Sequence, residues 1–209
     1  MSSGEDYIQR AELLADLGRY EDAAAEVGHL IAREPDNVLA LILLARIHVA
    51  ADKPAEALVS ADAAVAADPE NVPALIMRGI ILSELERLSE AAQTADLVLS
   101  LAPNDPYAQT SAAAILADVR NDQRAMDAAW HGVQLAPENA TAHLVLGVVS
   151  ARMHLFQLAE RAYREALRLD PQLAHARHDI GIIRLEQRRY AQALEHLAEA
   201  AAVEPTHVA

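Results

Sequence analysis

The sequence predicts an all-α solenoid, and three observations predict it. A proline recurs every 34 residues without a single insertion. Apolar residues make up 53% of the chain but aromatic residues only 3%, so alanine, leucine and valine must supply the core, and this composition favours helix. Strict self-similarity at this period is the signature of stacked repeats, each of which buries its apolar face against its neighbours. The recurring residues are Pro35, Pro69, Pro103, Pro137, Pro171 and Pro205.

The repeat divides the chain into six units, and we expect each to be one pair of antiparallel helices. With the proline at position 32 of each unit, the units are 4–37, 38–71, 72–105, 106–139, 140–173 and 174–207. They form a single predicted array over 4–207, with short tails at 1–3 and 208–209. The break at each proline is therefore a joint between units of one array and not a boundary between two domains.

Two positions in each unit are always small, which indicates close packing of the two helices. Position 20 is alanine in all six units, and position 8 is alanine or glycine. Small residues at fixed points allow two helix backbones to approach closely. The residues are Ala23, Ala57, Ala91, Ala125, Ala159 and Ala193 at position 20, and Ala11, Ala45, Gly79, Ala113, Gly147 and Gly181 at position 8.

The ends of the helices follow from the residues around each proline. Proline disfavours the α conformation of the residue before it, so each second helix ends there. An Asn or Asp two residues later can N-cap the next helix, as at Asn37, Asn71, Asp105 and Asn139. Pro73 and Pro106 lie in the first turn of a predicted helix, where a missing N–H costs nothing.

Composition excludes several classes of function. The chain has no cysteine, so disulfides, thiolate metal sites and cysteine nucleophiles are all excluded. Residues 1–139 carry 9 Lys/Arg and 23 Asp/Glu, a net charge of −14, which disfavours binding to nucleic acid. The N-terminus shows no signal peptide, and no stretch is long and apolar enough for membrane insertion. We therefore expect a cytoplasmic protein.

The pattern resembles the tetratricopeptide repeat over residues 4–207. The residues that carry the resemblance are the small position 8, the alanine at 20, the proline at 32, and Gly18, Tyr20, Tyr163 and Tyr190. The resemblance implies a right-handed superhelix in which the first helices line a concave groove and the second helices form the convex face. It also implies that a protein or peptide is the partner and that positions 2, 5, 6, 9, 12 and 13 of the first helix hold it.

Those positions are mostly apolar in this sequence, which predicts an apolar groove that binds a peptide or an amphipathic helix. The family's carboxylate-binding constellation and its asparagine ladder are both missing. The alternative is that some of these residues, such as Ile80 and Val145, only pack between neighbouring first helices. The predicted groove residues are Leu39, Ile42, Leu43, Arg46, Val49, Ile76, Met77, Ile80, Thr110, Ser111, Ala114, Leu144, Val145 and Val148.

Several charged residues on the first helices have two interpretations. Arg46 could bind a carboxylate of a partner protein. Glu12 holds the same position one unit earlier, however, and an internal ion pair between Arg46 and Glu12 is the favoured interpretation. Arg78 falls at a normally buried position, so we expect its side chain to extend to a neighbouring acid. Asp118, Arg152 and Glu186 follow one another at position 13 and are candidates for a surface ladder of charges.

The sequence predicts no catalytic site, no cofactor and no metal site. His175, His178 and Asp179 are close in sequence, but no further ligand is evident, and scattered surface histidines are the ordinary case. No nucleophile with a nearby base and no phosphate loop is present. Trp130, the only tryptophan, is expected at an outward helix position and offers a fluorescence probe.

The C-terminal unit lacks a polar capping helix. Its residues Leu194, Leu197, Ala201 and Val203 would have no following helix to cover them. Either the chain is part of a longer protein, or a partner or second copy covers this face. The predicted function is a non-catalytic scaffold or adaptor. The alternatives are a repeat that forms a homo-oligomer through this end, and the regulatory domain of a longer enzyme or membrane protein.

Overall fold

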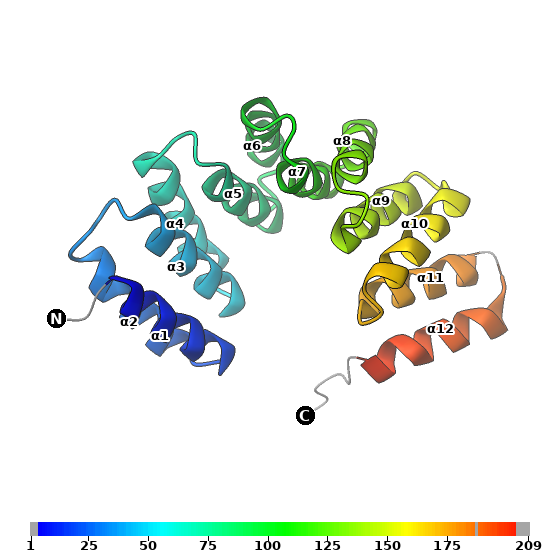
Figure 1. Ribbon diagram of the computed structural model, residues 1–209, viewed down its shortest axis with the longest axis horizontal. Coiled ribbons are helices and arrows are strands. Elements are labelled where there is room, and N and C mark those ends of the chain that lie inside the picture. Colours follow the sequence, from blue (N-terminus) through cyan, green and yellow to red (C-terminus); the bar gives the residue numbers. More distant parts are fainter. Residues whose placement is uncertain (1–3, 187, 204–209) are drawn as a thin grey trace. The chain divides into compact units, whose positions relative to one another are not determined.

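A computed structural model describes residues 4–186 and 188–203, and all of its regular structure is α-helical. The chain divides into two compact units, residues 1–102 and 103–209, and each is described here by itself. The described helices confirm the all-α prediction, with two helices in each 34-residue repeat (Figure 1). None of the described helices is both long and apolar enough to cross a membrane.

The first unit holds three helical hairpins. Its helices are α1 (Gly4–Asp16), α2 (Tyr20–Ile31), α3 (Val38–Ala50), α4 (Pro54–Ala67), α5 (Val72–Glu84) and α6 (Leu88–Leu101). Within it, α1 contacts α3 and α3 contacts α5, so the first helices of the repeats lie side by side. Each second helix packs on the first helix of the next repeat, α2 on α3 and α4 on α5.

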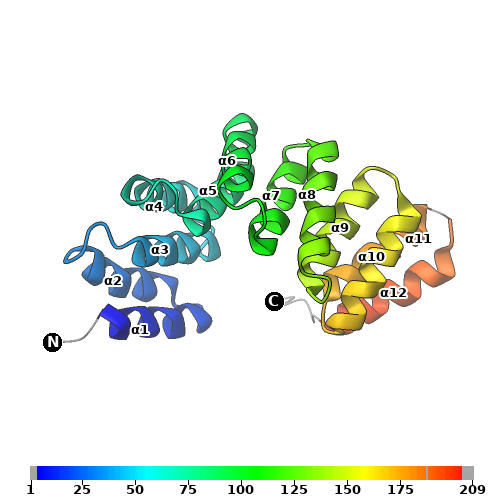
Figure 2. The ribbon, with the colours of Figure 1, turned by 45° about the horizontal axis from the view of Figure 1, so that its top comes forward.

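The second unit repeats this arrangement. Its helices are α7 (Pro106–Asp118), α8 (Asp122–Leu135), α9 (Ala140–Arg152), α10 (Phe156–Leu169), α11 (Ala174–Glu186) and α12 (Tyr190–Val203). Here α9 packs against α8, α10, α7 and α11, which places it between the two second helices α8 and α10 (Figure 2).

The predicted N-caps are confirmed at four helices. In each case the side-chain oxygen of the capping residue accepts a hydrogen bond from the backbone N–H three residues later, at 2.8–3.1 Å. This bond satisfies one of the amide groups that have no partner within the helix. The capping residues are Asn37, Asn71, Asp105 and Asn139.

The turn inside each hairpin uses a residue with positive φ. In the first repeat this residue is Gly18, but the corresponding residues in the other five are Asp52, Glu86, Arg120, His154 and Arg188, with φ of 56–59°. The amides that follow bond back to the end of the first helix; Lys53 N, for example, donates to His48 O at 2.9 Å. This C-cap geometry turns the chain into the second helix.

The small residues at position 8 do lie where two helices approach closely. Gly147 of α9 faces the ring of Tyr163 on α10, and a Cβ on Gly147 would lie only 2.5 Å from two ring carbons. Gly181 meets Leu197 of α12 in the same way, at 2.7 Å. Ala11, Ala45 and Ala113 at this position are fully buried. The hairpins therefore pack as the sequence predicts.

Candidate functional site

The first-helix face of the first unit, formed by α1, α3 and α5, carries eight of the predicted groove residues. Leu39 is 70% exposed and Ile80 37% exposed, and Arg46 is exposed as well. Ile42, Val49 and Met77 are partly buried. An apolar surface that solvent can reach therefore exists on this face.

Two residues of that prediction are packed inside the first unit instead. Leu43 is 5% exposed and joins the core cluster of Ala11, Val27 and Ile47. Ile76 is only 1% exposed. The physical reason is the close approach of neighbouring first helices, which was the alternative interpretation of these positions. The surface available to a partner is correspondingly narrower.

In the second unit the predicted groove residues lie on α7 and α9. Ser111, Ala114 and Val145 are partly exposed, as are Leu144 and Val148, which pack on the core around Tyr163. Thr110 differs, because it is only 7% exposed. Its hydroxyl lies 2.8 Å from the place where a Cβ on Gly132 would stand, so Thr110 fills the contact between α7 and α8.

A pocket of about 420 Å³, the α1–α3 pocket, opens on the first-helix face of the first unit. Arg46 and the exposed acids Glu12 and Asp16 lie around it. The predicted ion pair between Arg46 and Glu12 is not formed among the described residues, although both side chains line the same pocket. The pocket is lined by Glu12, Ala15, Asp16, Tyr20, Leu43, Arg46, Ile47 and Ala50.

The second unit has a pocket at the same place in the repeat, the α9–α11 pocket, of about 200 Å³. Its lining residues Val148, Ala151, Arg152 and Phe156 lie four repeats after Glu12, Ala15, Asp16 and Tyr20. Asp179, Ile182 and Ile183 likewise correspond to Leu43, Arg46 and Ile47. Both pockets therefore combine an aromatic side chain with aliphatic and charged neighbours, in a pattern set by the repeat.

Tyr163 forms part of the α9–α11 pocket and is 1% exposed. Burial raises the pKa of its phenol well above the ordinary value, and the charge of Asp179 and a hydrogen bond to it act in the same direction. The phenol therefore stays neutral and serves as part of the core.

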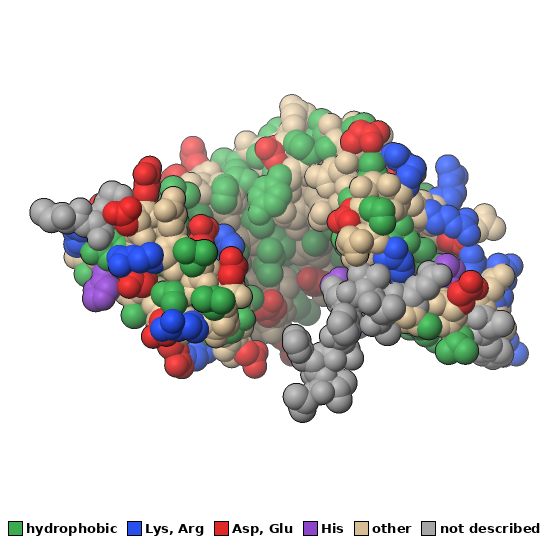
Figure 3. All heavy atoms as spheres, turned by 60° about the horizontal axis from the view of Figure 1, so that its bottom comes forward, with side chains coloured by type: hydrophobic (Ala, Val, Ile, Leu, Met, Phe, Trp, Pro, Cys, Tyr) green, Lys and Arg blue, Asp and Glu red, His purple; other side chains and the backbone are tan. Residues whose placement is uncertain are grey.

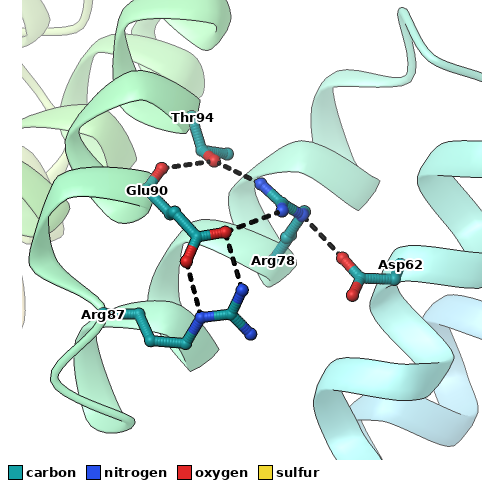
Figure 4. A network of polar contacts seen from close by, with 5 residues as sticks. All are labelled: Asp62, Arg78, Arg87, Glu90 and Thr94. Carbon is teal, nitrogen blue, oxygen red and sulfur yellow. Dashed lines mark hydrogen bonds and ion pairs between the residues drawn. The ribbon is translucent and has the colours of Figure 1, made fainter.

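Arg78 is confirmed to reach neighbouring acids, within the network drawn in Figure 4. Its Nε donates to Asp62 Oδ1 at 2.6 Å and its Nη1 to Thr94 Oγ1 at 2.8 Å. Glu90 Oε2 lies 3.7 Å from Nη2 of Arg78 and also accepts from Arg87 at 2.7 Å. This hydrogen bond and the charge of Arg87 lower the pKa of Glu90.

The charges at position 13 form a pair with a residue outside the predicted ladder. Arg152 Nε donates to Asp122 Oδ1 at 3.3 Å. Asp118 is close enough for the charge of Arg152 to lower its pKa, but burial outweighs this and raises it overall. The side chain of Glu186 lies outside the described part of the chain, so the ladder stays a prediction.

The histidine group at the start of α11 makes one local contact. His178 Nδ1 lies 3.1 Å from Asp179 Oδ1, and His175 is exposed. Across the described residues, no three His, Asp or Glu side chains gather in a way that could hold a metal ion.

The face predicted for self-association is described in part. Leu194 is 71% exposed, while Leu197 is partly buried and packs against Gly181. The side chains of Ala201 and Val203 lie outside the described part of α12.

The sequence analysis missed a pocket formed by α8, α9 and α10 of the second unit. Trp130 of α8 is 45% exposed and lines a pocket of about 440 Å³ with Leu146 of α9 and Leu158 and Arg161 of α10. The sequence did contain a signal for this pocket. Asp62 and Glu90 on second helices of the first unit correspond, two repeats later, to the apolar residues Trp130 and Leu158. We call this the second-helix pocket.

Known proteins match the chain as follows. Two family models, both described as Tetratricopeptide repeat, match residues 8–72 and 48–115. Solved structures with a similar fold include the APC/C hetero-tetramer Cut9–Hcn1, at 15% identity and a TM-score of 0.81. The match covers 99% of this chain and 41% of the chain in that structure. The type IV pilus biogenesis factor PilW is 18% identical with a TM-score of 0.79, covering 98% of this chain and 95% of PilW.

A third similar structure is YrrB, described as a TPR protein with an unusual peptide-binding site. It is 19% identical with a TM-score of 0.55 and covers 87% of this chain and 93% of YrrB. The chain spans about two fifths of the chain that it matches in Cut9–Hcn1. No curated protein sequence matches it.

Proposed function

The chain belongs to the tetratricopeptide-repeat family, and from this premise we propose that it is a non-catalytic scaffold or adaptor. Its first-helix face binds a peptide or an amphipathic helix of another protein. One observation carries the proposal: the α1–α3 and α9–α11 pockets occupy the same register positions of the repeat in two separate units. A surface that recurs with the repeat suits an extended or helical partner that presents side chains at regular intervals.

The apolar residues of the first-helix face, most of which lie outside the linings of the two pockets, indicate the chemistry of the partner. Ile42, Val49, Met77 and Ile80 leave an apolar surface on the first unit, and Val148 and Ile182 do so on the second. Burial of apolar side chains of the partner would supply most of the binding free energy. Arg46 lines the α1–α3 pocket, and its guanidinium can pair with a carboxylate of the bound segment. This ion pair would fix the orientation of the segment.

The experiment is affinity capture of partners by wild-type protein and by a double variant, Ile80→Glu with Val148→Glu. Both side chains are at least partly exposed, so the helices can tolerate the change; Ile76, a less suitable choice, is buried. We expect the double variant to lose the captured partner and to keep its far-UV circular dichroism. A folded double variant that still captures the same partner would contradict the proposal. Gln123→Glu adds a negative charge at an exposed position of α8, away from the first-helix face, and is the control for the effect of charge alone.

The alternative of self-association through α12 has one observation in its favour, the 71% exposure of Leu194. Sedimentation velocity over a range of protein concentrations separates the two. A concentration-dependent increase in sedimentation coefficient that Leu194→Glu abolishes would support self-association, and a constant coefficient would exclude it.

A further inference from the structure

The second-helix pocket has a companion beside it on α10. A second pocket, of about 620 Å³, is lined by His154, Leu155, Phe156 and Gln157 and shares Leu158 and Arg161 with the first. Both α8 and α10 pack on α9, which contributes His143 and Leu146 to the first of the two pockets. The two pockets therefore form one site with two compartments that meet at Leu158 and Arg161. Each compartment combines apolar side chains with polar ones: His143, Arg164 and Glu165 in the first, and His154 and Gln157 in the second.

In the first unit the same register positions are closed by a polar network. Asp62, Arg78, Glu90 and Thr94 hold the positions that Trp130, Leu146, Leu158 and Ala162 hold two repeats later. There the guanidinium of Arg78 bonds to Asp62 and Thr94, and Glu90 lies beside it (Figure 4).

The second unit has replaced all three charges of that network with apolar side chains. What remains at these positions is an open pocket with apolar side chains in its wall. Trp130 in this pocket and Leu155 in the adjoining one are each 45% exposed. Exposed aromatic and aliphatic side chains that gather around a concave site are typical of a surface that binds another molecule.

The positive charge near this site comes from the arginines of α10, most of which have acidic partners. Figure 3 shows basic side chains (blue) over the second unit. On α10, Arg164 pairs with Glu160, and Arg168 pairs with Glu165 and Glu138. Glu165 lines the pocket, but its hydrogen bond to Arg168 and the charge of that residue lower its pKa, so it stays ionised and engaged.

Arg161 differs from its neighbours. It is exposed, it borders both compartments, and within the described residues it forms no hydrogen bond or ion pair. Its planar guanidinium, with several N–H donors, suits a carboxylate. Arg164 also lines the first compartment, but it pairs with Glu160, which Arg184 contacts as well. Among the described residues that line the site, Arg161 is therefore the guanidinium without a partner.

We propose that this site binds an extended peptide segment of another protein that carries an apolar, an acidic and an apolar side chain at alternate positions, so that all three lie on one face. The apolar side chains occupy the compartments on either side of Leu158, and the carboxylate pairs with Arg161. The site is formed mainly by the second helices, and Phe156 is the described residue that it shares with the α9–α11 pocket of the first-helix face. Complementary charge selects the acidic segment, because the exposed guanidinium repels a basic one.

Trp130 makes the test direct, since it is the only tryptophan of the chain and lines the pocket. The probe is a blocked peptide of sequence Gly-Leu-Gly-Asp-Gly-Leu-Gly, in which both leucines and the aspartate lie on one face of an extended chain. It is acetylated and amidated so that it carries no terminal charge, and its Asn counterpart serves as the neutral control. We expect the Asp peptide to give a saturable blue shift of the Trp130 emission at up to about 1 mM peptide. The Asn peptide should bind about tenfold more weakly, as expected from the loss of one charged hydrogen bond.

Matched variants locate the interaction on α10. Arg161→Gln should weaken binding of the Asp peptide by about tenfold, whereas Arg33→Gln makes the same change of charge at an exposed residue of the first unit and should alter it less than about twofold. Leu158→Glu should abolish binding while far-UV circular dichroism confirms the fold. Val148→Glu, on the first-helix face, should leave binding unchanged, which separates this site from the proposed function.

Four results would overturn the proposal. They are an emission maximum that does not respond to the Asp peptide, equal affinity for the Asp and Asn peptides, and equal weakening by Arg161→Gln and Arg33→Gln. The fourth is an emission maximum that shifts with protein concentration in the absence of peptide, because a second copy of the chain would then occupy the site.

Discussion

Arg78 and Asp62 join two neighbouring hairpins of the first unit. Asp62 lies on α4 and Arg78 on α5, and the Nε of the arginine donates to the carboxylate at 2.6 Å. The Arg78 side chain is only 24% exposed, and its other nitrogens face Thr94 and Glu90 of α6. One guanidinium thus connects three helices, in a position where a typical repeat would place an apolar side chain.

Replacement of Arg78 by alanine should lower the free energy of unfolding by about 1–3 kcal/mol. The change removes the packing of a long side chain and leaves Thr94, which is buried, without one of its hydrogen bonds. Arg87→Ala is the control, because Arg87 bonds to Glu90 at the surface and such pairs contribute little. Urea denaturation followed by circular dichroism measures both, and an equal loss in the two variants would contradict this role of Arg78.

Two glycine-to-alanine changes should have opposite effects. In Gly147→Ala the new Cβ would lie 2.5 Å from the buried ring of Tyr163, so we expect a loss of about 1–3 kcal/mol. In Gly28→Ala, within α2, the Cβ would meet no atom within 4 Å, and the better helix propensity should stabilise the protein by up to about 1 kcal/mol. Thermal and urea denaturation of the two variants would contradict the packing described if both shifted in the same direction.

Asn139 should contribute to stability through its side-chain oxygen, which accepts from Ala142 N at 3.1 Å. Asn139→Ala should cost about 1 kcal/mol, because an amide at the start of α9 loses its partner. Asn139→Asp keeps the acceptor and adds a negative charge at the N-terminus of the helix, so it should retain or exceed the wild-type stability. Equal destabilisation by Ala and Asp, measured by urea denaturation, would show that the cap is not the reason.

Most of the fold could be predicted from the sequence because the same pattern of prolines and small residues recurs in all six units. The prolines gave the ends of the second helices, and Asn37 and its equivalents gave the starts of the first helices, because both effects act over only three or four residues. The positive φ of Glu86 or Arg120 carried no such signal. Those residues adopt it because the hairpin as a whole requires the turn, and neither residue type prefers this conformation.

The candidate site was harder to predict, because burial depends on neighbouring repeats. Ile76 and Ile80 look alike in the sequence, yet the first is 1% exposed and the second 37%. Four residues along a helix leave two side chains on nearly the same face, and only the packing of adjacent first helices decides which is covered. Thr110 is buried because Gly132, on another helix, leaves room for it.

Stability at alkaline pH should depend on Tyr163. Burial raises the pKa of its phenol above the ordinary value of about 10, at which the phenol ionises in the unfolded chain. Above about pH 10 the unfolded chain therefore releases a proton that the folded protein retains, and stability falls by up to about 1.4 kcal/mol per pH unit. Below that pH this contribution is fully present.

The test compares urea denaturation at about pH 8 and about pH 11 for the wild type and for Tyr163→Phe, which has no phenol to ionise. The variant should lose less stability than the wild type between the two pH values, even though other groups that titrate in this range affect both. Tyr107→Phe is the control, because Tyr107 is 59% exposed and its replacement should leave the wild-type pH dependence in place. If Tyr163→Phe and Tyr107→Phe lost the same stability on going to high pH, the buried phenol would not be the group responsible.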